Sequence, residues 1–456
     1  MSSEVKLSAP ARPTALTTGA LALVALGTGL VLATYVTPMA TIADTLGDLH
    51  GGPAARAWVM SAMSIGLAAT LLATGALGDR VGRRRTFVAG LVVLGLGAVA
   101  CVAVTDTGWF VAARVLQGVG GAAVLACGLA VLAASTEGHH RIRATGVWGA
   151  SLGLGITAGV VLAGLFGSGH WRASYVVTAL LALALAPLSR RGLPESAALV
   201  PRGIDVPGVG LLSLGLAALV AAVTEARSGV TPLMATLTVA TIALGVAFAL
   251  VERRVAQPLV EPELLHSPRF LAATIGSTVV GLGIVAMASN AAGLVQQGLG
   301  STVGQATLPL LVWSVASVVA SLAARHLRVT VPGPRLIAIA LAVVGAGELL
   351  ALGVTADSSP WRLAPAFLVT GLATGVLNAV LGRESVASVP PDRAAMGSGA
   401  SNTARYLGAA CGITLFSVLM THSGPDLTGG WNVATAVAAG LTLAGAALVA
   451  WVGRRA

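Results

Sequence analysis

The chain of 456 residues is 56% hydrophobic and only 10% charged, with a formal net charge of +10 and a mean hydropathy of +0.89. Soluble domains average roughly 25% charged residues, so this composition excludes a soluble globular protein. Apolar stretches of about 20 residues, each long enough to cross a hydrocarbon core about 30 Å thick, recur along the whole chain. The sequence therefore predicts an all-α, polytopic membrane protein.

About fourteen transmembrane spans are predicted in chain order. Their ranges are 15–46, 55–77, 86–106, 108–134, 143–166, 172–189, 206–226, 231–252, 270–296, 302–324, 335–355, 362–389, 394–420 and 430–452. We expect the first span to be retained rather than cleaved as a signal peptide, because it is too long and many more spans follow it. Pro38 lies within this span and is expected to kink it, which neighbouring helices can accommodate.

Arginine sets the predicted orientation. The chain has one lysine and 26 arginines. With the N-terminus inside, the cytoplasmic segments hold 20 of these cations and the outer loops only four, Arg56, Arg172, Arg227 and Arg362. This bias follows the positive-inside rule and places both termini in the cytoplasm. The net charge is therefore expected to face anionic membrane lipids, and we expect no nucleic-acid partner.

The loops leave no room for a separate soluble domain. The longest polar connections, 190–205 and 253–269, are under twenty residues each. The sequence has no zinc-type spacing of Cys and His and no polar catalytic cluster, so we expect neither a metal site nor an enzyme. The function must therefore lie within the helical bundle.

One connection is unusually dense in charge. Residues 75–85, which we call the signature stretch, read GALGDRVGRRR and join the second and third spans. Its glycines let two helix ends approach closely, and we expect Asp79 to accept hydrogen bonds from free N–H groups at the start of the third span. Its arginines can hold neighbouring helix ends at the lipid headgroups. The residues singled out are Gly75, Gly78, Asp79, Arg80, Gly82, Arg83 and Arg84.

The signature stretch closely resembles the signature loop of the major facilitator superfamily. In the fourth span, Arg114 and Gln117 belong to RVLQGVGG, which resembles the family's Arg-x-x-Gln-Gly motif. In the fifth span, GITAGVVLAG resembles the glycine pattern of the family's antiporters, with valine and alanine replacing a proline and a glycine. The glycines that match this pattern are Gly155, Gly159 and Gly164.

Two further stretches, SNTARYLG at 401–408 and DVPG at 205–208, resemble the family's fourteen-helix drug–proton antiporter branch. The resemblance covers essentially the whole chain and implies a major-facilitator-type bundle of 6+2+6 helices in two pseudo-symmetric halves. The implied segments are an N-terminal tail 1–14, a six-helix bundle 15–189, a loop 190–205, a two-helix linker 206–252, a loop 253–269, a six-helix bundle 270–452 and a tail 453–456. In the second half, the basic loop 325–335 corresponds to the signature stretch but lacks its acid.

The resemblance also implies a function. It implies a secondary transporter that exports amphipathic drugs or natural products, with the substrate between the halves and transport by rocking about that site. It further implies a monomer that needs no cofactor beyond a proton gradient. The heavy use of Ala, Gly and Arg indicates a bacterial genome, and hence a bacterial cytoplasmic (inner) membrane.

Ionised side chains inside the spans cost about 2.5–3.5 kcal/mol each at the bilayer centre, so each should have a partner or a task. The candidates for the conduit or for proton coupling are Arg114, Gln117, Glu348, Arg405, Asp44, Glu225 and Glu384. Glu348 has the most apolar flanks, which favour the protonated form that coupling requires, but an ion pair with Arg405 is an alternative. Glu225 is expected near the outer interface and Glu384 in a structural pair with Arg383.

Two features leave alternatives open. The antiporter branch usually has an acid in its first span at the position of Val31. A facilitator or symporter for a small metabolite, without the usual proton coupling, is therefore a second interpretation, and a membrane enzyme or receptor is a third. Trp148 and Trp313 lie inside spans, where they can stack on a flat ligand or simply pack against lipid and neighbouring helices.

Overall fold

The computed structural model describes residues 17–50, 53–166, 169–196, 205–255, 263–324, 331–422 and 426–455. Throughout these ranges the regular structure is helical and no strand is present. The predicted tail 1–14 and most of the basic loop 325–335 lie outside the described residues. The prediction of an all-α membrane protein is confirmed.

The helices follow the predicted spans closely. In the first half they are α1 (Thr18–Asp48), α2 (Pro53–Val81), α3 (Arg83–Ala103), α4 (Thr107–Ala134), α5 (Gly138–Phe166) and α6 (Trp171–Gly192). A pair follows, α7 (Val206–Glu225) and α8 (Pro232–Glu252). The second half holds α9 (Pro268–Val280), α10 (Ala286–Gly293), α11 (Val303–Ala323), α12 (Gly333–Leu349), α13 (Ala364–Ala387), α14 (Ala394–His422) and α15 (Leu427–Val452).

Thirteen helical segments among the described residues are long and apolar enough to cross a membrane. One of them runs from Pro268 to Gly298 and contains α9 and α10 with two π-helical turns, η3 (Gly281–Val285) and η4 (Leu294–Gly298). Helix α12 has 17 residues and packs in the bundle against α13 and α15. Seventeen residues are within the range that can span a membrane, so α12 completes the predicted set.

Local sequence explains where several helices begin. Asp106 accepts hydrogen bonds from the N–H groups of Gly108 and Trp109 at the start of α4. Thr302 and Gln305 form a capping box at the start of α11. Such side chains satisfy backbone donors that have no partner within the helix. The connections are therefore short and the helix ends well defined.

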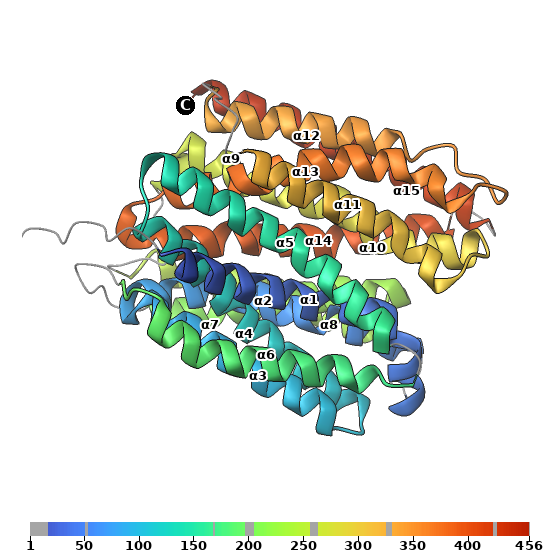
Figure 1. The fold of residues 1–456 in the computed structure, drawn as a ribbon, viewed down its shortest axis with the longest axis horizontal. Helices are drawn as coiled ribbons and strands as arrows, with labels where there is room; N and C mark the ends of the chain where they lie inside the picture. The colour runs from blue at the N-terminus through green and yellow to red at the C-terminus, as the bar shows by residue number, and fades with distance from the viewer. Residues whose placement is uncertain are drawn as a thin grey trace, which may run out of the picture.

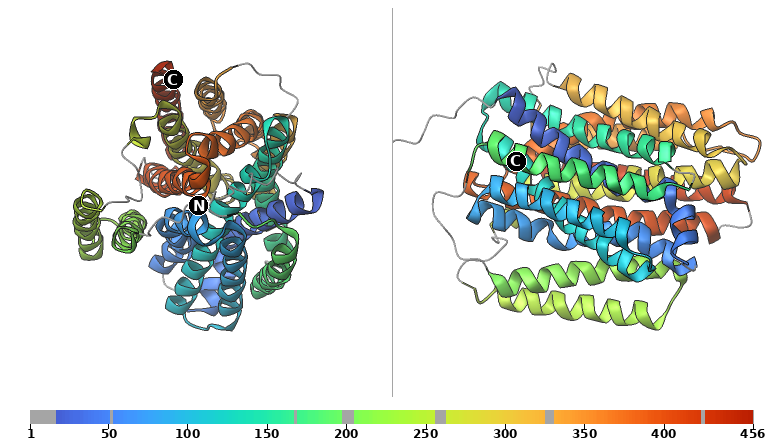
Figure 2. Two further views of the ribbon diagram at one scale, coloured as in Figure 1. Left: turned by 90° about the vertical axis from the view of Figure 1, so that its left-hand side faces the viewer. Right: turned by 60° about the horizontal axis from the view of Figure 1, so that its bottom comes forward.

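The helices form two bundles that lie side by side, α1–α6 and α9–α15, with α7 and α8 standing to one side (Figure 1, Figure 2). Helix α7 packs against α2, and α8 has no buried residue. Helix α5 packs against α11 and α13 of the second bundle, and α14 packs against α2 and α4 of the first. Since α5 and α14 are the fifth helices of their halves and contact the second and fourth of the other, the interface has a pseudo-twofold arrangement.

Candidate functional site

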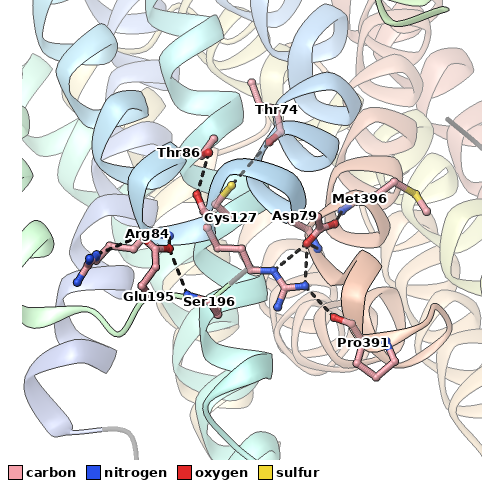
Figure 3. A network of polar contacts seen from close by, with 12 residues as sticks. Thr74, Asp79, Arg84, Thr86, Cys127, Glu195, Ser196, Pro391 and Met396 are labelled. Atoms are coloured by element: carbon pink, nitrogen blue, oxygen red, sulfur yellow. Dashed lines mark hydrogen bonds and ion pairs between the residues drawn. The ribbon is translucent and has the colours of Figure 1, made fainter. Parts of the chain in front are cut away.

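The signature stretch connects the two halves. We call the end of the bundle that holds this stretch the basic end, and the opposite end the far end. Asp79 is 6% exposed and its two carboxylate oxygens accept the N–H groups of Ala395 and Met396, at 3.1 and 2.9 Å (Figure 3). Arg83 pairs with Asp79 at 2.7 Å and donates to the carbonyl of Pro391 at 2.7 Å. The acid therefore satisfies free donors at the start of α14, and not at the start of α3 as expected.

A different acid serves the start of α3. Glu195, which follows α6, accepts the N–H of Arg84 at 3.1 Å and lies 3.4 Å from its guanidinium (Figure 3). Arg84 also donates to the carbonyl of Leu193 beyond the end of α6. Gly82, at φ +124°, turns the chain between α2 and α3, and a Cβ there would lie 2.7 Å from Glu195. Arg80 is exposed.

Around this cluster, the backbones of α2 and α14 also come into close contact at the basic end. A Cβ added at Gly75 of α2 would lie 2.5 Å from the carbonyl oxygen of Ala395, and one at Gly399 of α14 would lie 2.5 Å from that of Leu71. Only glycine permits such an approach without a shift of the helices. In the described conformation the two halves are thus joined at the basic end.

A cavity of about 90 Å³ lies between the halves near the middle of the helices. Helices α1 and α5 line one side and the second half lines the other, through η3, α10, α11, α13 and α14. Tyr35 of α1 and Tyr406 of α14 meet edge to face across it, with ring centroids 5.7 Å apart. Concave, mostly apolar sites with a few polar groups are the usual form of small-molecule sites.

Of the predicted site residues, Trp313 and Arg405 line this cavity. Arg405 donates to the side-chain oxygen of Asn378 at 3.0 Å. Trp148 is 1% exposed, packs on Gly382 of α13 and is not among the residues that line this cavity, which agrees with the packing alternative.

Arg114 is fully buried within the first half and does not line the cavity. Its guanidinium donates to the side chain of Gln117 at 2.7 Å and to the carbonyl of Thr34 at 2.9 Å. That carbonyl would normally accept the N–H of residue 38, but Pro38 has none. Arg114 therefore satisfies the helix bond that Pro38 leaves open, directly behind Tyr35 of the cavity.

Replacing Arg114 with Gln is expected to destabilise the protein by about 1–3 kcal/mol, because the Thr34 carbonyl loses its donor. We expect transport to be lost in Arg114→Ala and partly kept in Arg114→Lys, which retains the charge without the planar fork. The loss of stability in Arg114→Gln is measured as the fall in melting temperature of the purified variant. In a Pro38→Ala background, residue 38 again has an N–H to donate to the Thr34 carbonyl, so Arg114→Gln should lose less stability. An equal loss of stability in both backgrounds would contradict the role of Arg114 as donor to that carbonyl.

Glu348 is 0% exposed in the last turn of α12. Its carboxyl faces the π-helical turn η3, where a Cβ at Gly283 would lie 2.8 Å from it. Among the described residues no cation pairs with Glu348, so the predicted alternative of an ion pair with Arg405 is not formed. The other side of η3 packs on α14 at Arg405 and Ala409. A buried carboxyl and the cavity thus lie on opposite sides of one π-helical turn.

The other acids predicted as candidates, Glu384, Glu225 and Asp44, do not line the cavity. Glu384 pairs with Arg383 at 3.1 Å, as expected, and also with Arg269 at 2.9 Å. Glu225 accepts from the indole of Trp58 at 3.2 Å and ties α7 to α2. Asp44 is partly exposed toward the far end of α1.

The glycine pattern of α5 serves helix packing. Gly155 lies directly against the backbone of Gly29, and a Cβ at Gly159 would lie 2.5 Å from the carbonyl of Ala33. Both hold α5 tightly against α1. Gly164 closes the pattern two residues before the end of α5.

Two helical bundles that enclose a central cavity and join through polar contacts at one end are the architecture of a polytopic membrane transporter. The sequence profile of the Major Facilitator Superfamily matches residues 19–413, and the chain belongs to this family.

The chain is similar to bacterial relatives over most of its length. It is 34% identical over 433 residues to the puromycin resistance protein pur8 of Streptomyces alboniger, covering 89% of this chain and 85% of that protein. It is 29% identical over 387 residues to a probable actinorhodin transporter of Streptomyces coelicolor, covering 82% and 67%. The crystal structure of the human organic anion transporter MFSD10 (TETRAN) is similar with a TM-score of 0.67 at 17% identity, covering 94% of this chain and 99% of that one. At this identity the structural likeness shows the fold alone.

Proposed function

We propose that this transporter exports amphipathic antibiotics or related drugs across a bacterial cytoplasmic membrane in exchange for protons. The observation that carries the proposal is the central cavity between the two halves, which are joined on its basic side by the cluster of Asp79, Arg83, Pro391, Ala395 and Met396, called here the Asp79 cluster. The names of two relatives, a puromycin resistance protein and a probable actinorhodin transporter, support export of natural products. One chain encloses one pathway, so a monomer suffices.

Orientation follows from charge. The positive-inside rule favours a cytoplasmic position for the arginine-rich basic end, with both termini on that side. The described conformation is then closed toward the cytoplasm. For substrate to enter from the cytoplasm, the bonds from Asp79 to α14 must break and the two halves must rock apart.

Proton coupling is assigned to Glu348. Its apolar surroundings and the absence of a pairing cation among the described residues favour reversible protonation. A charge change there acts on η3, which also packs on α14 beside Arg405. Single π-helical turns inside α-helices are frequent at functional sites.

A facilitator or symporter without proton antiport is the second candidate. Val31 is fully buried against Gly121 in the apolar core of the first half, where the antiporter branch is expected to carry an acid. Proton dependence therefore decides between the two.

The first test is compound accumulation in bacterial cells that express the protein. The panel contains anionic, neutral and cationic amphipathic antibiotics and dyes, each measured with and without a protonophore. We expect lower accumulation of at least one compound, and we expect the protonophore to abolish the difference. Reduced accumulation that persists with the protonophore would instead favour the facilitator.

A further inference from the structure

The two walls of the central cavity differ in chemistry. The first half contributes apolar side chains, among them Leu32 and Val36 of α1 and Leu152 and Ile156 of α5. The second half contributes most of the polar groups, from α11, α13 and α14. A ligand that fills this cavity therefore meets apolar surface on one side and hydrogen-bonding groups on the other.

Several of these polar groups have no hydrogen-bond partner among the described residues. The indole N–H of Trp313, the hydroxyls of Ser317 and Thr374, and the Nε of Arg405 are buried atoms without a hydrogen bond among the described residues. The side chains of Ser317 and Thr374 are 1% exposed, and Trp313 is 6% exposed. An unmade buried hydrogen bond costs about 1–3 kcal/mol, so four of them around one cavity indicate groups kept for a ligand and its water.

The charge of the cavity is one-sided. Among the described residues that line it, Arg405 carries a charge and none is acidic. The neighbouring acids are engaged elsewhere or screened from it: Asp79 and Glu384 form ion pairs at the basic end, and Glu348 lies behind η3. A cationic ligand would meet an uncompensated guanidinium there, whereas an anion would neutralise it.

We propose that the cavity binds an amphipathic organic anion, with a carboxylate or phenolate as its acidic group. The acidic group lies at Arg405 with Trp313, Ser317 and Thr374, and the apolar body lies against α1 and α5. Because the cavity of about 90 Å³ is smaller than a drug-sized molecule in the described conformation, the halves must move apart to admit the body. This inference rests on the proposed function, because it takes the cavity to be the transport site. A charge-assisted bond to guanidinium is about twice as strong as a neutral one, so Arg405 is the main source of selectivity.

The test is binding of a matched set of probes to the purified full-length protein in phosphatidylcholine nanodiscs. The probes are 4-(1-pyrenyl)butyrate, its neutral primary amide and 4-(1-pyrenyl)butylamine, which share one apolar body. We expect the carboxylate to bind about tenfold more tightly than the amine. In Arg405→Gln the carboxylate should lose about tenfold in affinity or more, while the amide changes little. Arg405→Lys should lie between, and it also serves if the Gln variant does not fold.

Arg362→Gln is the matched control, because Arg362 lies at the far end and donates to the carbonyls of Leu350 and Leu352. Its probe affinities should equal those of the parent protein. Three results would overturn the proposal. The amine binds the parent as tightly as the carboxylate does, the carboxylate does not bind, or both Arg405 variants keep the parent's affinity for the carboxylate. If the cells export only cations, the anion proposal fails but the export function stands. If the protein binds anions selectively but exports no compound, the export function fails but the anion proposal stands.

Discussion

Transport should fall more than tenfold in Asp79→Asn although the protein still inserts. The amide keeps the shape of the carboxylate but cannot accept from Ala395, Met396 and Arg83 together. Arg83, whose side chain is 4% exposed, then loses its ion pair. In the proposed rocking mechanism this cluster breaks when the basic end opens, so losing about 2 kcal/mol there shifts the ratio of conformations by about thirtyfold.

The native thiol of Cys127 can report this shift. It is fully buried in α4 at the basic end, 3.8 Å from the carbonyl of Thr74 (Figure 3). In a Cys101→Ala, Cys411→Ala background, maleimide should modify Cys127 slowly in the parent and much faster in Asp79→Asn. Arg80→Gln, which changes an exposed charge of the same stretch, is the control. If Asp79→Asn transports normally and its Cys127 thiol stays protected, the signature stretch serves only to orient the protein in the membrane and does not control the conformation.

The second large effect is expected from Glu348→Gln, which mimics the protonated carboxyl. This variant should bind substrate with nearly the parent affinity and should not respond to a pH gradient, because it can neither release nor accept a proton. Substrate-induced proton release from purified protein in weak buffer measures this directly. The compound added is one that the parent exports in cells.

Glu225→Gln is the matched control for that experiment. Glu225 is an acid at the end of α7 that accepts hydrogen bonds from Trp58 and Thr231, away from η3, so proton release should persist. If Glu348→Gln releases protons like the parent, the coupling carboxyl lies elsewhere, and Asp44, Glu225 and Glu384 become the next candidates.

The fold could be predicted from sequence because a membrane requires long apolar helices and short loops. The expected span 302–324, for example, became α11 at Val303–Ala323. The π-helical turns η3 and η4 were not expected, since no local residue pattern marks them. The partner of Asp79 was placed on the wrong helix because it lies 316 residues along the chain, and local helix-capping rules favour the nearer helix start.

The site was harder to predict than the fold. Helices that are apolar on all sides give no periodicity to show which face lines a cavity. Arg405 and Trp313 could be singled out because charge and aromatic rings are rare in these spans, but Ser317 and Thr374 resemble any small packing residue. Glu195 was missed as well, because an acid in a polar loop carries no distinguishing signal.

Transport by purified protein in liposomes tests the central claim most directly. The vesicles have an acidic lumen, and the compound is one that the protein exports in cells. Its uptake is followed with and without nigericin, and vesicles without protein are the control. Antiport predicts that protons leaving the lumen drive the compound inward, that nigericin abolishes this accumulation, and that Glu348→Gln lacks it. Equal uptake with and without the gradient, or movement of the compound outward with the protons, would contradict proton-coupled export.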